Sequence, residues 1–164
     1  MIKPENVIRG SAGSVVYVKN GKAQELGCVQ SFKATIDIDN TEIKRISLDG
    51  GMTLHKQGMM SGSWEATVDY SLPVLREYIE DYKNTGLMPR LKFVITNDDA
   101  SSKVGKQIVT IKECLLDSIP LVSLDAESEA LTDDISGTFD DFDINTHFDH
   151  RWDVYGGETD YSGT

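Results

Sequence analysis

Residues 123–144, SLDAESEALTDDISGTFDDFDI, decide the fold of this 164-residue chain. Side chains of a β-strand alternate between its two faces, so residues two apart share a face. One face of the stretch carries the large apolar side chains of Leu131, Ile135 and Phe139, and with them Asp133 and Asp141. The other face is small, hydroxylated and acidic. The pattern predicts a long amphipathic strand with one face on a core and one in water, or an ordinary exposed sheet edge.

Further strands precede this stretch. Residues 14–19, SVVYVK, lead into Asn20-Gly21, a hairpin signal because both positions of a type I′ turn need positive φ. A return strand is expected from Lys22. In residues 31–39, four apolar side chains alternate with polar ones, which is the clearest two-residue period of the chain. Residues 63–70, 89–96 and 107–116 have strand character as well, so the sequence predicts seven or eight strands.

One helix is expected between residues 71 and 86. Ser71 can cap its N-terminus, Pro73 suits its first turn, and Gly86 is a stop signal. We therefore predict a mostly β fold, an antiparallel β-sandwich or partly closed barrel of about seven or eight strands with one flanking α-helix. A single domain would span residues 1–144, followed by an acidic C-terminal tail over residues 145–164.

Residues 40–62, NTEIKRISLDGGMTLHKQGMMSG, lack a sustained period and contain four glycines. A connection of this length without secondary structure is uncommon in a compact domain and often functional. We interpret it as an extended arm that orders against a neighbouring molecule, since methionines and small residues suit adaptable interfaces. The alternative is a short extra hairpin with a turn. The candidate interface residues of the arm are Ile43, Ile46, Met52, Leu54, Met59 and Met60.

The charge of the chain is unevenly distributed. The formal net charge is −11, and from Asp117 onward there are 13 acidic residues and one basic residue, Arg151. The preceding 116 residues are nearly balanced. A field of this sign repels nucleic acid, which argues against tight DNA binding but suits passage of DNA without adhesion. The sequence contains neither an apolar run of the ~18 residues that span a membrane nor an N-terminal apolar signal segment.

Motifs for chemistry are lacking in the sequence. It has no phosphate-binding glycine pattern and no nucleophile motif, so no catalytic, cofactor-binding or metal-binding residue is predicted and the protein is not expected to be an enzyme. A cluster of His147, Asp149, His150 and Asp153 lies in the tail without a framework and is interpreted as surface residues. Cys28 and Cys114 are expected to be buried free thiols rather than a disulfide.

Two blocks carry a family resemblance. SLDAESEAL…GTFDDFDI, together with the upstream GGMTLHKQGMMSGSWEATVDY, resembles the tail tube proteins of contractile (myovirus-type) phage tails, defective-prophage particles and phage-like contractile bacteriocins. The resemblance covers roughly residues 7–144, with the blocks in the family's order. The tail over residues 145–164 departs from it, because chains of this family usually stop soon after the TFDDFD segment.

The resemblance implies a structural subunit with two antiparallel sheets and a flanking helix. Six copies would form a ring, and stacked rings would form a hollow tube with an acidic lumen. The 40–62 arm would reach a neighbouring subunit or ring. Expected partners are further copies of the chain, a sheath protein, tape-measure and baseplate proteins and passing DNA, with no membrane. The location would be a virion tail or phage-like particle, assembled in the bacterial host cytoplasm. Candidate lumen acids are Asp133, Asp134, Asp140 and Asp141.

Other readings of the sequence stay open. The same features suit the tube of a contractile bacteriocin that carries no genome. A different class is a small-ligand-binding β-barrel, which in most cases has a secretory signal and needs an apolar cavity, or a scaffold β-sandwich. Composition and periodicity alone lead only to an acidic, mostly β domain with one helix and an oligomer-prone arm.

Overall fold

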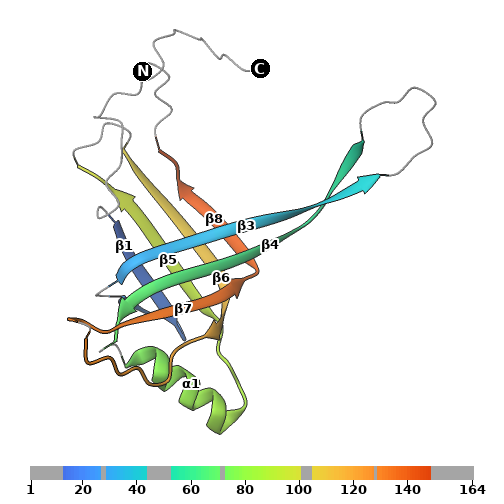
Figure 1. The fold of residues 1–164 in the computed structure, drawn as a ribbon. Coiled ribbons are helices and arrows are strands. Elements are labelled where there is room, and N and C mark those ends of the chain that lie inside the picture. Colours follow the sequence, from blue (N-terminus) through green and yellow to red (C-terminus); the bar gives the residue numbers. More distant parts are fainter. Residues whose placement is uncertain are drawn as a thin grey trace. The chain divides into compact units, whose positions relative to one another are not determined.

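The computed structural model describes residues 13–26, 29–43, 53–70, 73–100, 105–127 and 129–148. The chain divides into two compact units, each assembled from separate parts of the sequence. Unit 1 consists of Met1–Gly27, Pro89–Lys112 and Phe142–Thr164, and unit 2 of Cys28–Met88 and Glu113–Asp141. The described residues contain eight strands and one helix (Figure 1). The predicted class, mostly antiparallel β with one helix, is therefore confirmed.

Unit 1 is built from β1 (Gly13–Lys19), β2 (Lys22–Glu25), β5 (Leu91–Asp98), the first part of β6 (Lys106–Ser118) and most of β8 (Asp141–Thr146). The strand order is β2-β1-β5-β6, and β8 also pairs with β6. Asn20 and Gly21 have φ values of 52° and 78°, so the predicted type I′ turn between β1 and β2 is confirmed. The core side chains of this unit are Val15, Tyr17, Leu26, Leu91, Phe93 and Ile111.

Unit 2 contains β3 (Val29–Ile43), β4 (Leu54–Asp69), β7 (Thr132–Phe139), the second part of β6 and the helix α1 (Val74–Thr85). Its strand order is β6-β7-β4-β3. The residues of β4 that the two-residue period places on one face, Trp64, Ala66 and Val68, are all buried. The Trp64 ring stacks on Phe32 of β3 with centroids 5.9 Å apart. The core is completed by Leu75, Tyr78, Cys114, Leu116, Ile135 and Phe139.

Glycine at position 137 is required by this packing. A Cβ atom there would overlap the backbone carbonyl oxygen of Leu115 and lie 2.7 Å from the Trp64 indole. Trp64 and Gly137 are directly opposite each other in the β4–β7 ladder. The large ring therefore occupies the space that the missing side chain leaves, which lets β6, β7 and β4 pack closely at this point.

The helix ends as predicted but begins later. Gly86 has a φ of 71°, and its N–H donates to the Tyr82 carbonyl at 2.8 Å, the left-handed C-cap that the sequence indicates. At the other end the N-cap is Pro73, without a side-chain hydrogen bond, and not Ser71. Within the described part of the chain, this 12-residue helix is the only one, and it is too short and polar to cross a membrane.

The decisive stretch is not one long strand. Burial alternates as predicted from Thr132 to Phe139, but β7 ends there, and β8 begins at Asp141 after a break at Asp140. The described residues between 119 and 131 form no strand. The continuous strand expected from the pattern was therefore wrong in its extent. Most of the predicted tail, from residue 149 onward, lies outside the described residues.

Candidate functional site

The outer halves of β3 and β4 form a two-stranded ribbon that leaves the sheet of unit 2. β4 pairs with β7 only from Gly62 to Asp69, whereas its pairing with β3 continues as far as Ile43 opposite Leu54. We call residues 38–43 and 54–61 the arm ribbon. Figure 1 shows it extending beyond the rest of unit 2. The expectation of an irregular connection over residues 40–62 was therefore wrong for the described residues, which form a hairpin with a bulge between Ile38 and Asn40.

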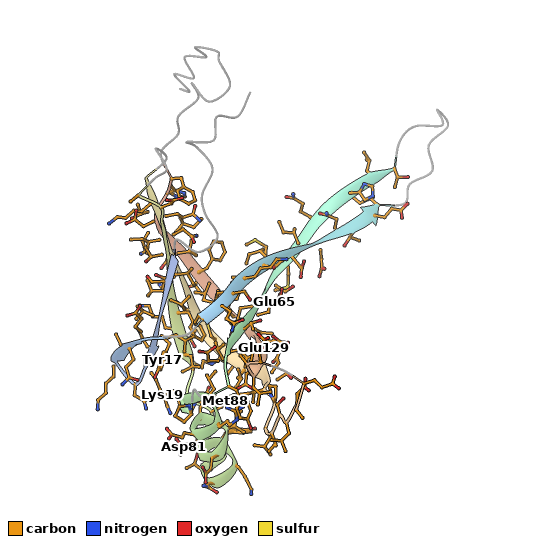
Figure 2. The ribbon with its side chains drawn as sticks, turned by 60° about the vertical axis from the view of Figure 1, so that its left-hand side comes forward. Tyr17, Lys19, Glu65, Asp81, Met88 and Glu129 are labelled. Atoms are coloured by element: carbon orange, nitrogen blue, oxygen red, sulfur yellow. The ribbon has the colours of Figure 1, made fainter. Side chains whose placement is uncertain are left out.

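The arm ribbon carries exposed apolar side chains. Met59 is 83% exposed and Met60 is 63% exposed. Figure 2 shows side chains projecting from both sides of the ribbon. An isolated two-stranded hairpin is marginally stable in water, so this surface gains from a partner that covers it. Of the six predicted arm residues, Ile43, Leu54, Met59 and Met60 are exposed on the ribbon, while Ile46 and Met52 lie outside the described residues.

The sheet of unit 2 has a second, polar face. Register places Lys33, Glu65 and Ser136 in one row across β3, β4 and β7, and Thr67 and Asp134 in the next. The Thr67 hydroxyl donates to Asp134 Oδ1 at 2.8 Å, which ties two strands together on this face. A shallow depression lies over these rows, and Glu65 is labelled in Figure 2. The remaining side chains that the β3–β4–β7 register places on this face are Ser31, Thr35, Asp37, Ser61, Ser63, Asp69, Thr132 and Thr138.

The four predicted lumen acids do not lie together. Asp133 is 1% exposed on the core face of β7, so the prediction that it lines a lumen was wrong for this residue. Asp134, its neighbour, is exposed on the polar face. Asp140 and Asp141 are exposed at the junction of β7 and β8. The alternation of side chains separates Asp133 from Asp134, because adjacent residues of a strand point to opposite faces.

Arg76 of α1 explains how a carboxylate is accommodated in the core. Its Nη2 lies 2.6 Å from Asp133 Oδ2, and its guanidinium stacks on the Tyr70 ring at 4.4 Å from the centroid. The same group donates to the backbone carbonyls of Tyr70, Pro120 and Leu121. One side chain thus connects α1, β7, the end of β4 and the segment after β6.

Several contributors were missed at the sequence level. Asp37 and Glu65 share the polar face with Asp134, and the two-residue period of residues 31–39 carried the signal for Asp37. The helical period of residues 74–83 places Arg76 opposite the apolar side chains, on the side where solvent is expected, and so gives no sign of its contact with Asp133. A charge on the apolar face of β7 was itself a sign that a buried cation must lie nearby, since buried carboxylates are paired.

The structure offers no site for a metal in the part of the chain it describes, where no three His, Cys, Asp or Glu side chains converge. Of the tail cluster only His147 belongs to that part. Cys114 is buried, as predicted, and Cys28 lies outside the described residues.

Residues 1–145 match a family model described as phage tail tube protein. This chain belongs to the phage tail tube protein family. The resemblance seen in the sequence blocks is thereby confirmed. Two proteins of Bacillus subtilis (strain 168) are each 29% identical to this tail tube protein over 143 residues, which are 87% of this chain and 93% of theirs. One is the phage-like element PBSX protein XkdM, and the other is the uncharacterized protein YqbM.

Solved structures share the fold of this tail tube protein. A chain of the extended sheath–tube complex of the extracellular contractile injection system PVC has a TM-score of 0.67 at 13% identity, over 88% of this chain and 95% of that one. A chain of the anti-feeding prophage baseplate has a TM-score of 0.63 at 14% identity, over 88% and 97%. The SPP1 tail tube has a TM-score of 0.59 at 17% identity, over 87% and 81%.

Family membership places the protein among structural proteins and not among enzymes. It is a structural subunit of a tail tube and a component of the tail of a virion or phage-like particle. The arm ribbon and the polar face of unit 2 are therefore its candidate functional surfaces.

Proposed function

We propose that this tail tube protein assembles into six-membered rings that stack into the hollow tube of a contractile tail, with the polar face of unit 2 lining the lumen. Six copies per ring follow from the family resemblance. The number is supported by the gene transfer agent tail refined with C6 symmetry and by the 6-fold symmetrised anti-feeding prophage baseplate, both of which contain chains with this fold.

The composition of the polar face carries the lumen assignment. Register places four carboxylates, those of Asp37, Glu65, Asp69 and Asp134, against one ammonium group, that of Lys33. The remaining side chains assigned to this face are serines and threonines. Carboxylates repel the phosphates of DNA, and short hydroxylated side chains offer few contacts to a base or phosphate. Such a surface lets a polyanion or an extended protein slide past. Asp140 and Asp141 are exposed nearby in sequence and are retained as lumen candidates.

The arm ribbon is the proposed contact between subunits. Its exposed methionines and its lack of a third strand mean that it gains apolar burial and order when a neighbour covers it. The two strands of the ribbon hold its side chains at fixed register, so the contact is preorganised in the backbone while the methionine side chains adapt.

Further partners follow from the same proposal. A contractile sheath would surround the tube, a tape-measure protein would occupy the lumen during assembly, and the tube would start on a baseplate. In an infectious phage DNA would then pass through it. A tube of a contractile bacteriocin, which carries no genome, would use the same surfaces and is the second candidate.

Negative-stain electron microscopy of the purified protein, alone and with baseplate seeds, tests the assembly. Rings or hollow tubes are the expected result. A protein that stays monomeric even on seeds would refute the proposal. In a variant with residues 41–61 replaced by a short turn, we expect a folded subunit that forms no tubes. Tubes of normal length from this variant would show that the arm is not required for assembly.

The lumen assignment has its own test. Changing Asp37, Glu65 and Asp134 to lysine turns a face with net charge −3 into one with net charge +3, because four lysines then stand against Asp69. Assembled tubes of this variant should retain DNA at low salt and release it as salt rises, because counterion release governs such binding. The matched control changes three exposed acids of α1, Glu77, Glu80 and Asp81, to lysine. Nuclease protection of retained DNA then separates lumen from outer surface, and equal unprotected binding by both variants would contradict the assignment.

A further inference from the structure

The bulge of the arm ribbon divides it into two halves. One residue of β3, Asp39, lies opposite two residues of β4, Gly58 and Met59. A Cβ atom at Gly58 would lie only 3.0 Å from the Asp39 carbonyl oxygen, so glycine lets the two strands stay close at this point. We call the part next to the sheet of unit 2, residues 38, 60 and 61, the near half, and the part beyond the bulge, residues 40–43 and 54–57, the far half.

In the near half, the apolar side chains continue the core face of the sheet. Register places Ile38 opposite Met60, and the two-residue period puts both on the face of Trp64. Trp64 is buried, whereas Ile38 is 47% exposed and Met60 63%. The opposite face of the ribbon carries Ser61, which follows Asp37 along the polar face of unit 2. The near half is thus amphipathic in the same sense as the sheet it leaves.

The far half is amphipathic in the opposite sense. Ile43 is opposite Leu54, and the two side chains are 41% and 43% exposed. Because Ile43 follows Ile38 by an odd number of residues, it lies on the other face of the ribbon. Its face also carries Thr41 and Lys56, while the reverse face carries Asn40, Glu42, His55 and Gln57. The apolar side therefore changes faces at the bulge, and the twist of a ribbon turns both faces together without exchanging them.

The two strands reach this reversal by different routes. In β3, the five residues from Ile38 to Ile43 change the face within a continuous strand. In β4, the six residues from Leu54 to Met60 would keep the face, but the extra residue of the bulge changes it. Pairing without the bulge would put Ile43 and Leu54 on opposite faces. The apolar residues of both strands form one far pair only because the bulge is there.

The two apolar pairs call for contacts on opposite sides of the ribbon. An amphipathic face of a sheet packs its apolar side on another body, yet all four side chains of these pairs are exposed in the subunit. Layers that pack on the two faces of a sheet lie about 10 Å away on either side. One flat surface therefore cannot cover both the near pair and the far pair.

We propose that the arm ribbon passes between two other copies of this chain, with Ile38 and Met60 against one copy and Ile43 and Leu54 against the other, an inference that rests on the proposed assembly. Copies are the expected occupants because stacked rings surround each subunit with neighbours in its own ring and in the next. The gene transfer agent tail, which contains a chain of this fold, was refined with helical and C6 symmetry. Each ribbon would thereby hold two further subunits together.

A swap variant tests the reversal at unchanged composition. Glu42→Ile, Ile43→Glu, Leu54→His and His55→Leu together exchange the faces of the far half, so its apolar pair joins the face of the near pair. All four positions are exposed, so the subunit should fold and keep the wild-type melting temperature. Polymerisation should need an about 10-fold or more higher concentration, because two half-exposed apolar side chains no longer meet their neighbour.

The matched control for the swap exchanges two polar side chains of the far half, Asn40→Gln and Gln57→Asn, and should polymerise like the wild type. A swap variant that also polymerises like the wild type would overturn the inference, because apolar content and not its facing would then govern assembly.

Photo-cross-linking counts the neighbours of one ribbon. A benzophenone amino acid replaces Met60 in one variant, Leu54 in a second and both residues in a third, each mixed as a minor component into wild-type protein. Each single-site subunit should yield a dimer, and the two-site subunit a trimer with two wild-type copies. Dimers alone from the two-site subunit would place both pairs on one copy and overturn the inference. The control carries the same group at His55, on the polar face of the far half, and a yield equal to that at Leu54 would overturn the facing assigned here.

Electron microscopy of the same samples separates this inference from the proposed assembly. Trimers from a protein that forms no rings would uphold the inference and refute only the rings. Well-formed tubes in which the two-site subunit yields only dimers would uphold the tube and overturn the inference. Absence of cross-linked product at either site overturns it whatever particles are seen.

Discussion

Replacing Arg76 by methionine tests how the core of unit 2 is held together. Methionine keeps an apolar stem of similar length but removes the guanidinium, which contacts Asp133, the Tyr70 ring and three backbone carbonyls. Asp133 would then be a carboxylate with 1% exposure and no cation. Its other oxygen, Oδ1, already has no hydrogen-bond partner among the described residues, so little compensates for the loss.

The size of the effect follows from burial. Removing one partner of a buried ion pair costs about 3–5 kcal/mol, because the remaining charge stays desolvated. The Arg76 side chain is 21% exposed, so water can enter where the guanidinium was, and we expect the lower end, about 3 kcal/mol. With a urea dependence of about 2 kcal/mol per molar, the unfolding midpoint should fall by about 1.5 M.

Urea unfolding followed by Trp64 fluorescence, in a Trp152→Phe background, measures this shift in unit 2. The double variant Arg76→Met with Asp133→Leu removes both charges and should recover most of the loss, since an apolar pair can replace a buried ion pair. Lys112→Met is the matched control. Its partner Asp143 is 52% exposed, so this change should cost less than about 1 kcal/mol. If Arg76→Met shifted the midpoint no more than Lys112→Met, the role assigned to the buried pair would be wrong.

Three further changes have definite outcomes. Gly137→Ala should destabilise unit 2 by about 3 kcal/mol or more, seen as insoluble or early-melting protein, because the new methyl group overlaps the Leu115 carbonyl. Gly21→Ala, whose site is open but has a φ of 78°, should cost only about 1 kcal/mol by the same melting assay. Phe32→Leu removes the ring stacked on Trp64 and should lower stability by about 1 kcal/mol with a shifted tryptophan emission, and an unchanged spectrum would contradict the stacking.

Much of the fold was readable from local sequence. The Asn20-Gly21 turn and the stop at Gly86 are cases in which one residue type meets a need for positive φ, so local chemistry suffices. The alternation within β4 and β7 was also visible, because one face of each strand packs on a core. Where burial on one face imposes a period, the sequence records it.

The arm ribbon was hidden for the opposite reason. Its residues are exposed on both faces, so no core selects apolar residues at every second position. The bulge between Ile38 and Asn40 also shifts the pairing. The apolar residues therefore look scattered although the backbone is regular. The sequence does hold a sign of the break at Asp140, because Phe139 and Phe142 are three residues apart and the apolar side chains change parity there.

Asp133 shows where pattern alone misleads. The two-residue period places Asp133 on the face of Leu131 and Ile135, whereas its charge favours exposure to solvent. The prediction of a lumen position followed the charge. The cation that resolves the conflict lies 57 residues away in sequence. Pairings of that kind depend on how α1 is placed on the sheet, which no local period encodes.

The interleaving of the two units has a consequence for synthesis. β7 stands between β6 and β4, and its partners in β4 precede it by about 70 residues, as in Gly62 opposite Phe139. The sheet of unit 1 likewise cannot be completed before β8 has been synthesised. Neither unit can close until the ribosome has released almost the whole described chain. A prematurely terminated polypeptide therefore lacks a complete sheet in either unit. The order of the strands thus makes folding depend on synthesis of nearly the whole described chain.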